Sequence, residues 1–120
     1  MAKIMVIDDS ATEIRVLQNL LEKKGHQVSV ALSAEEGLNM LPGASPDLVL
    51  MDVVMPGMNG FQATRKLSKN PDTSHIPVVI VTTKNQETDR IWGLRQGAKG
   101  FLTKPVAENE LFETIESLVG

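Results

Sequence analysis

Four short segments of this chain carry side chains that could perform chemistry together. Each segment lies at the end of an apolar run: Asp8-Asp9 follows Lys3–Ile7, Asp52 follows Leu48–Met51, Thr82-Thr83 follows Val78–Val81, and Lys104-Pro105 follows Gly100–Leu102. Clustered carboxylates bind hard divalent cations, and a carboxylate placed beside positive charge can attack phosphorus. Hydroxyl and ammonium groups stabilise the oxygens of a phosphoryl group in transfer. We therefore ask whether the fold brings these segments together.

The acidic residues would repel one another if they met. Two like charges about 5 Å apart repel by about 3 kcal/mol at an effective dielectric near 20, so three pairs would cost on the order of 10 kcal/mol. A cation must offset this repulsion, and an oxygen-only ligand set without cysteine suits Mg²⁺. Alone, each aspartate also has a structural interpretation: Asp8 or Asp9 as a helix cap, and Asp52 as a turn residue. Taken together, the three aspartates, Thr82 and Lys104 favour a metal-dependent functional site.

Within such a site the residues take different roles. Asp52 stands alone after a buried strand and is the expected nucleophile, whereas Asp8 and Asp9 are the expected metal ligands together with Asp52. Thr82 and Lys104 would contact the phosphoryl oxygens. The loop that begins at Val53 also offers a backbone carbonyl to the metal, which we assign to Val54.

Five apolar runs alternate with five helical patterns. The Val78–Val81 run of β-branched residues is typical of a strand covered on both faces, and a further run spans Gln27–Leu32. Helices are predicted after the capping patterns at Ser10 and Ser33, with Pro42-Gly43 beyond the second, from near Asn59 to before Asn70, from about Gln86 to Gln96, and from near Ala107. The alternation predicts an α/β, flavodoxin-like (βα)5 fold: a doubly wound parallel five-stranded sheet in the order 2-1-3-4-5. Functional residues of such sheets lie at the carboxyl ends of the strands.

Composition bounds the protein class. The 120 residues include no cysteine, which excludes disulfides, thiolate catalysis and zinc fingers. The net charge is −3. No basic block or long apolar run is present, so we expect no nucleic-acid partner and no membrane span. We expect one domain over residues 1–120, a cytoplasmic location without a signal peptide, and a monomer.

With these residues in hand, the chain resembles a response-regulator receiver domain of the stand-alone, CheY-like chemotaxis type. The resemblance rests on Asp8-Asp9, on Asp52 in Asp-Val-Val-Met-Pro-Gly-Met-Asn-Gly, on Thr82 and on Lys104-Pro105. It implies Mg²⁺-dependent transfer of a phosphoryl group from a histidine kinase to Asp52, followed by hydrolysis. It also implies a cis peptide bond between Lys104 and Pro105, and a phosphoacceptor regulator rather than an enzyme.

The resemblance also implies a switch and an output face. Thr82 would move toward the phosphoryl group and Phe101 would turn inward; simple core packing is the alternative explanation for Phe101. The output protein would bind the face of the fourth helix, fifth strand and fifth helix. Candidate residues on that face are Arg90, Leu94, Lys99 and Phe101. Trp92 is either a partner anchor or packs against the third helix, and His26 and His75 are interpreted as surface residues.

The chain departs from the usual receiver pattern near the switch hydroxyl, and one of its segments resembles a particular group of receivers. Receivers usually carry a small residue after the switch hydroxyl, where this chain has Thr83, so altered phosphorylation kinetics are expected. Val54 and Lys84 occupy the two positions whose side chains, in the family, flank the route of the attacking water. The segment from Gln86 to Ala98 is similar to the stand-alone receivers of type IV pilus (twitching) chemosensory systems.

Other functions fit the sequence less well or depend on a partner. No effector domain is expected after Gly120, so the protein would signal by docking or act as a phosphate sink for a shared kinase. A small aspartyl-phosphate phosphatase of the haloacid dehalogenase class would need a second aspartate at position 54, which is valine, and a cap domain. A flavin or nucleotide module would need a phosphate-binding loop where Asp8-Asp9 would repel phosphate.

Overall fold

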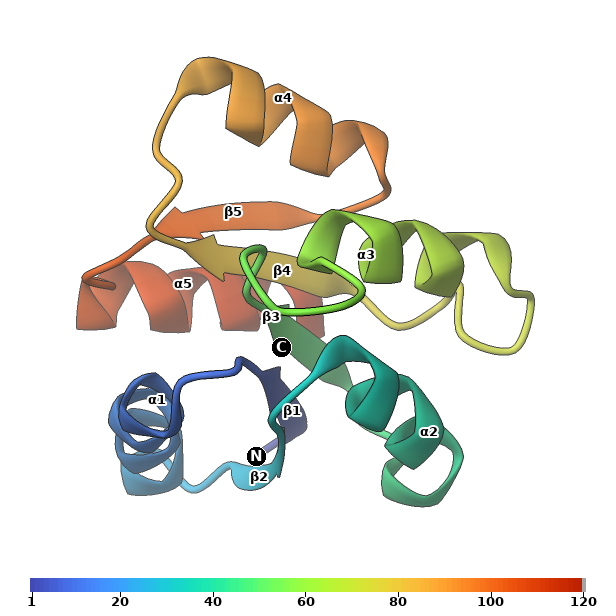
Figure 1. The fold of residues 1–120 in the computed structure, drawn as a ribbon. Coiled ribbons are helices and arrows are strands. Elements are labelled where there is room, and N and C mark those ends of the chain that lie inside the picture. Colours follow the sequence, from blue (N-terminus) through green and yellow to red (C-terminus); the bar gives the residue numbers. More distant parts are fainter. Residues whose placement is uncertain (120) are drawn as a thin grey trace.

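The computed structural model describes residues 1–119 and consists of a parallel β-sheet between two layers of helices (Figure 1). Its strands lie in the order β2-β1-β3-β4-β5, which confirms the predicted doubly wound order. The strands are β1 (Lys3–Ile7), β2 (Gln27–Ala31), β3 (Leu48–Met51), β4 (Val78–Thr82) and β5 (Gly100–Thr103). The helices are α1 (Ala11–Lys23), α2 (Ala34–Ala44), α3 (Gly60–Lys69), α4 (Glu87–Arg95) and α5 (Glu108–Val119).

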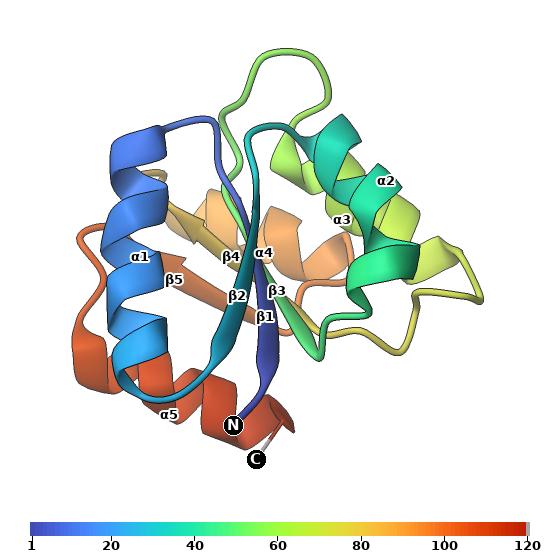
Figure 2. The ribbon, with the colours of Figure 1, turned by 90° about the horizontal axis from the view of Figure 1, so that it is seen from below.

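Each face of the sheet has its own hydrophobic core. Because successive strand residues point to opposite faces, Met5 and Ile7 pack with α2 and α3, whereas Ile4 and Val6 pack with α1 and α5. Helices α1 and α5 lie on one side of the sheet, and α2, α3 and α4 on the other (Figure 2). The three central strands β1, β3 and β4 are buried almost throughout. They form the rigid base from which the strand ends project.

Side-chain caps begin the first three helices where the sequence predicts. The Ser10 hydroxyl accepts a hydrogen bond from the Glu13 N–H at 3.3 Å, and the Ser33 hydroxyl accepts one from the Glu36 N–H at 3.1 Å. A reciprocal capping box between Asn59 and Gln62 begins α3. These caps fix the start of each helix next to the carboxyl end of a strand.

Some element boundaries differ from those predicted. Strands β4 and β5 each extend one residue further, because Thr82 pairs with Thr103 in the ladder, and β2 ends one residue earlier at Ala31. The prediction that Pro42-Gly43 lies beyond the second helix is wrong, since α2 runs through both to Ala44. Pro42 removes its own i→i−4 hydrogen bond and crowds the carbonyl four residues earlier, but α2 continues for only two residues after it, and the left-handed Ser45, with φ of 43°, ends the helix.

The two histidines differ in their surroundings. His75 is exposed, as expected, but the surface interpretation of His26 needs correction, because its side chain is half-buried. The His26 Nδ1 accepts a hydrogen bond from the Ala2 N–H at 3.0 Å, and its ring stacks on Phe112 with centroids 6.5 Å apart. Burial, and then the positive charge of the N-terminus, lower the pKa of His26.

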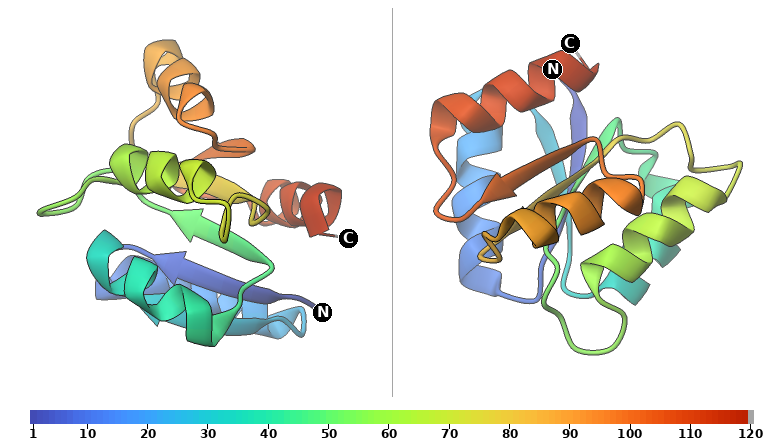
Figure 3. Two further views of the ribbon diagram at one scale, coloured as in Figure 1. Left: turned by 90° about the vertical axis from the view of Figure 1, so that its right-hand side faces the viewer. Right: turned by 90° about the horizontal axis from the view of Figure 1, so that it is seen from above.

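The loop between β3 and α3 projects beyond the carboxyl edge of the sheet (Figures 2 and 3). Within residues 1–119, no helix combines the length and hydropathy that a bilayer span would require.

Candidate functional site

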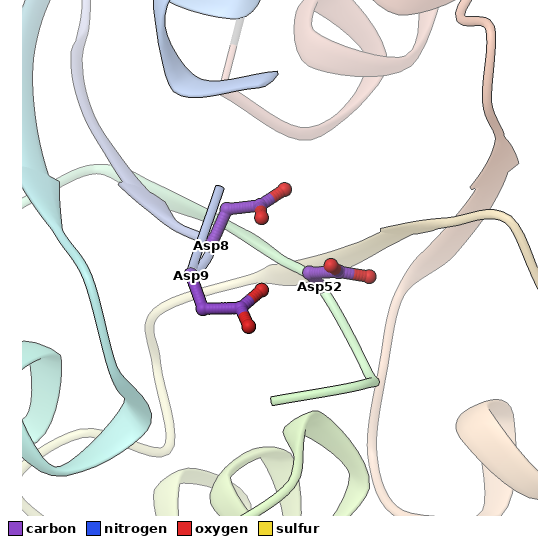
Figure 4. Close-up of side chains that lie close together, drawn as sticks. All are labelled: Asp8, Asp9 and Asp52. Carbon is purple, nitrogen blue, oxygen red and sulfur yellow. The ribbon is translucent and has the colours of Figure 1, made fainter. Parts of the chain in front are cut away.

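Three carboxylates meet at the carboxyl edge of the sheet. Strands β1 and β3 are neighbours and Ile7 pairs with Met51, so Asp8 and Asp52 leave the two strands at the same level. Asp9 follows Asp8, and each of the three residues offers an oxygen within 4.8 Å of those of the other two. Figure 4 shows the three side chains close together. The residues that the sequence analysis grouped therefore lie side by side.

Lys104 supplies positive charge to this cluster from the far side of β4. Its Nζ lies 2.7 Å from Asp8 Oδ2 and 3.5 Å from Asp52 Oδ2. The Lys104 N–H donates to the Thr82 carbonyl at 2.8 Å, which holds the segment after β5 against the end of β4. The Lys104–Pro105 peptide bond is cis. Only 8% of the Lys104 side chain is exposed, so its ammonium is committed to the carboxylates.

One member of the site is not predicted by the sequence patterns. Glu13 Oε2 lies 3.5 Å from Lys104 Nζ. In the sequence, Glu13 stands three residues after Ser10, where it indicates only a helix-capping pattern. Its position in the first turn of α1, the helix that begins at the carboxyl edge of β1, was the signal that could have placed it above the site.

The electrostatics of the cluster follow from burial and charge. Burial, and then the charge of Asp8, raise the pKa of Asp52, and the Lys104 ammonium, the Val53 N–H and the Thr82 hydroxyl oppose this rise. Burial alone would lower the pKa of Lys104, but its hydrogen bond to Asp8 and the surrounding carboxylate charges outweigh that effect and raise it. Lys104 is therefore held as a cation next to a carboxyl group whose pKa lies above its usual value.

Backbone contacts fix the orientation of Asp52. Its Oδ1 accepts a hydrogen bond from the Val53 N–H at 2.7 Å, and the Val53 carbonyl accepts one from the Gly60 N–H at 2.9 Å. Gly60 packs so closely on the Asp52 carbonyl that any Cβ there would overlap it. A residue with a side chain is thereby excluded at the start of α3, next to the site.

The remaining residues of the predicted centre surround these carboxylates. Thr82 is fully buried at the end of β4, and its Oγ1 accepts a hydrogen bond from the Lys84 N–H at 3.3 Å. Thr83 is exposed, and so is Val54, with 61% of its surface accessible. Lys84 Nζ lies 3.5 Å from Asp89 Oδ1 in the first turn of α4, so its charge is directed away from the carboxylates.

The proposed partner residues form a separate group on α4 and β5. Arg90, Leu94 and Lys99 are exposed, and Trp92 is 50% exposed. Phe101 is half-buried and packs against the core on the α2–α4 side of the sheet. These residues do not contact the carboxylate cluster directly, so any influence between the two would pass through β4, β5 and α4.

The donor set of the cluster fits a hard divalent cation. The three carboxylates carry more negative charge than Lys104 alone neutralises. Asp9 is exposed to solvent, as suits an ion such as Mg²⁺ that keeps several water ligands. Receiver domains bind Mg²⁺ at an acidic pocket of this kind. Asp8, Asp9 and Asp52 are the residues here that would hold it.

Comparison with known proteins agrees with the fold and shows the family. A family described as the response regulator receiver domain matches residues 4–116, and the chain belongs to this family. It is thus a receiver domain of two-component signalling.

Individual members of the family differ in how much of their length matches this chain. The chain is 56% identical to Protein PilH of Pseudomonas aeruginosa over 119 residues, which cover 99% of this chain and 98% of that protein. The chain is also 44% identical to Response regulator PleD of Caulobacter vibrioides. That match covers 98% of this chain but only 26% of PleD. Among solved structures, the Vibrio cholerae chemotaxis protein CheY4 matches with a TM-score of 0.90 and 28% identity, and 98% of each chain is covered. The likeness to PilH is with a protein of nearly the same length.

Proposed function

We propose that this protein is a phosphorylation-activated switch in which Asp52 accepts a phosphoryl group from the phosphohistidine of a histidine kinase. Asp8, Asp9, Asp52 and the backbone carbonyl of Val54 would hold Mg²⁺. The observation that carries the proposal is the placement of Lys104 Nζ between Asp8 and Asp52, at 2.7 and 3.5 Å, beside a third carboxylate. Positive charge held next to a buried carboxylate is what phosphoryl transfer to that carboxylate requires, because it stabilises the phosphoryl oxygens.

The chain's own residues account for the transfer. A carboxylate oxygen of Asp52 attacks phosphorus, a P–O bond forms, and the P–N bond breaks with its electron pair passing to the histidine nitrogen of the kinase. Lys104 and the Thr82 hydroxyl stabilise the phosphoryl oxygens, and bound Mg²⁺ would supply further charge neutralisation. Water then attacks phosphorus, the bond to Asp52 breaks, and inorganic phosphate leaves. The protein thus catalyses only its own phosphorylation and dephosphorylation.

Intact-mass spectrometry with a small phosphodonor tests this directly. Acetyl phosphate or phosphoramidate with Mg²⁺ is expected to add about 80 Da to the wild-type protein and nothing to Asp52→Asn. Asp47→Asn is the matched control, because Asp47 precedes β3 at the opposite end of that strand. An unchanged mass in a folded wild-type sample under saturating donor, or a mass gain in Asp52→Asn, contradicts the proposal.

For the output, docking of a partner on the α4–β5–α5 face is favoured over a role as a phosphate sink. Ile91, Trp92 and Leu94 are 44%, 50% and 42% exposed, so three large apolar side chains of α4 face solvent. Only Gly93 of this helix is buried. An apolar surface of this kind fits a protein partner, with Trp92 as an anchor.

A pull-down with and without beryllofluoride, which mimics the phosphoryl group on Asp52, separates the two roles. A signalling output predicts a partner captured in the beryllofluoride state and lost in Trp92→Ala. Val16→Ala on α1 is the control, since Val16 is similarly exposed at 53%. A protein that binds its kinase alone in both states would instead be a phosphate sink. A cytoplasmic location, a single domain over the whole chain and a monomeric state stay predictions.

The alternative of a phosphatase for external substrates is less well supported. Val54 is apolar and exposed where that chemistry would need a general acid. Sustained turnover of a phosphomonoester by the wild-type protein would favour that alternative.

A further inference from the structure

The loop from Asp52 to Asn59 carries the proposed ligand carbonyl of Val54, yet its tip has few attachments. Near Asp52 it is fixed through Val53, which contacts both the Asp52 carboxylate and the Gly60 N–H. Met55 is buried and holds the middle of the loop, but Val54 and Gly57 are exposed. Figures 2 and 3 show the loop standing clear of the sheet. Its geometry therefore depends on what anchors the tip.

That anchor is a carboxylate from a different element. Glu35 lies in the first turn of α2, and its Oε2 accepts a hydrogen bond from the Met58 N–H at 3.0 Å. Among residues 1–119, this is the one hydrogen bond that joins residues 54–58 to the rest of the chain. Gly57 lies against the same oxygen: a Cβ on Gly57 would stand 2.8 Å from Glu35 Oε2. The positive φ of Gly57, 77°, is the turn that presents the Met58 N–H to α2.

We propose that Glu35 is a positioning residue for the phosphorylation site, which holds the β3–α3 loop in the form that binds Mg²⁺. This inference rests on the proposed function, because it assigns Glu35 a role at the same centre. Glu35 does not contact Asp8, Asp9 or Asp52. It acts through the loop, whose other end is the nucleophile itself.

The chemistry of the contact supports this role. Hydrogen bonds to ionised acceptors are shorter and stronger than those between neutral groups, so a carboxylate is a better anchor for an N–H than an amide or hydroxyl. The Met58 N–H, and to a lesser degree the backbone of Glu35 itself, lower the pKa of the Glu35 carboxyl, which favours its charged form at neutral pH. Loss of the anchor leaves the tip with more conformations, and metal binding must then order it again.

Calorimetric titration of metal-free protein with MgCl₂ tests the proposal. Glu35→Ala is expected to weaken Mg²⁺ binding by about tenfold, while Glu35→Gln, which keeps an acceptor without the charge, stays within about threefold of wild type. The matched control is Glu36→Ala in the same helical turn. Glu36 also accepts a backbone hydrogen bond, but from the Leu32 N–H at 3.3 Å, away from the loop. This control is expected to bind Mg²⁺ within about twofold of wild type.

A second measurement distinguishes positioning from a general loss of stability. With acetyl phosphate as donor, the phosphorylation rate of Glu35→Ala should fall at low Mg²⁺ and recover at saturating Mg²⁺, whereas thermal melting in EDTA should be similar for Glu35→Ala and Glu36→Ala. Equal Mg²⁺ affinities for Glu35→Ala and Glu35→Gln, or for Glu35→Ala and wild type, overturn the positioning role and leave the proposed function standing. A wild-type protein that binds no Mg²⁺ overturns both.

Discussion

Replacement of Lys104 with methionine is expected to destabilise the protein in a way that Mg²⁺ partly repairs. Methionine keeps the apolar stem of the side chain and removes the ammonium. Asp8, whose side chain is only 2% exposed, then loses the cation that lies 2.7 Å from its Oδ2, and Asp52 loses one at 3.5 Å. The Ser10 N–H, which donates to Asp8 Oδ1 at 2.9 Å, remains but carries no full charge.

The magnitude follows from these distances. At an effective dielectric near 20, the attraction of Lys104 to Asp8 is about 6 kcal/mol and to Asp52 about 5 kcal/mol. Much of this is offset by the desolvation of a buried ammonium, and removal of one partner from a buried pair typically costs about 3–5 kcal/mol net. With an unfolding entropy of about 2.1 cal/mol/K per residue, a loss of this size lowers Tm by roughly 12–20 °C for a chain of this length.

Thermal unfolding followed by circular dichroism, in EDTA and in saturating MgCl₂, is the assay. Lys104→Met should melt far below wild type in EDTA and recover a larger increment than wild type when Mg²⁺ is added, because the ion replaces the missing charge. Lys99→Met is the control: Lys99 is exposed at the other end of β5 and takes part in no ion pair among the described residues. The reasoning is refuted if Lys104→Met is as stable as wild type in EDTA, or if Mg²⁺ raises both melting temperatures equally.

Two further substitutions probe the glycine at the site and the half-buried histidine. Gly60→Ala should be strongly destabilising, because its Cβ would overlap the Asp52 carbonyl, whereas Gly43→Ala in α2, with open space around it, should be neutral or add up to about 1 kcal/mol in chemical denaturation; similar values for the two variants would contradict the close packing. For His26 the folded-state pKa is lowered, so its contribution to stability is complete above the unfolded pKa of about 6.5 and is lost as the pH falls below it. The stability advantage of wild type over His26→Asn, which keeps an acceptor for the Ala2 N–H but does not titrate, should therefore shrink between about pH 7.5 and 5.5; parallel pH profiles would exclude this linkage.

Local patterns predicted much of this architecture because they depend on near neighbours in the chain. The β-branched run at Val78–Val81 and the serine caps at Ser10 and Ser33 are decided within a few residues, and the structure agrees with each. Pro42 is the exception: although proline disfavours a helix, α2 contains Pro42 and ends two residues later at Ala44.

By itself, the sequence determined the βα alternation and the four strand ends at which the reactive side chains stand, because hydrophobic periodicity and turn chemistry are local. The individual contacts between charged groups become visible only in the folded chain. The ion pair from Lys104 to Asp8 spans 96 positions, and the anchor from Glu35 to Met58 spans 23. No periodicity encodes such contacts, since they arise when strands pair and helices pack. For the same reason Glu13 and Glu35 read as ordinary first-turn acids of α1 and α2 until the fold brings one to the lysine and the other to the loop.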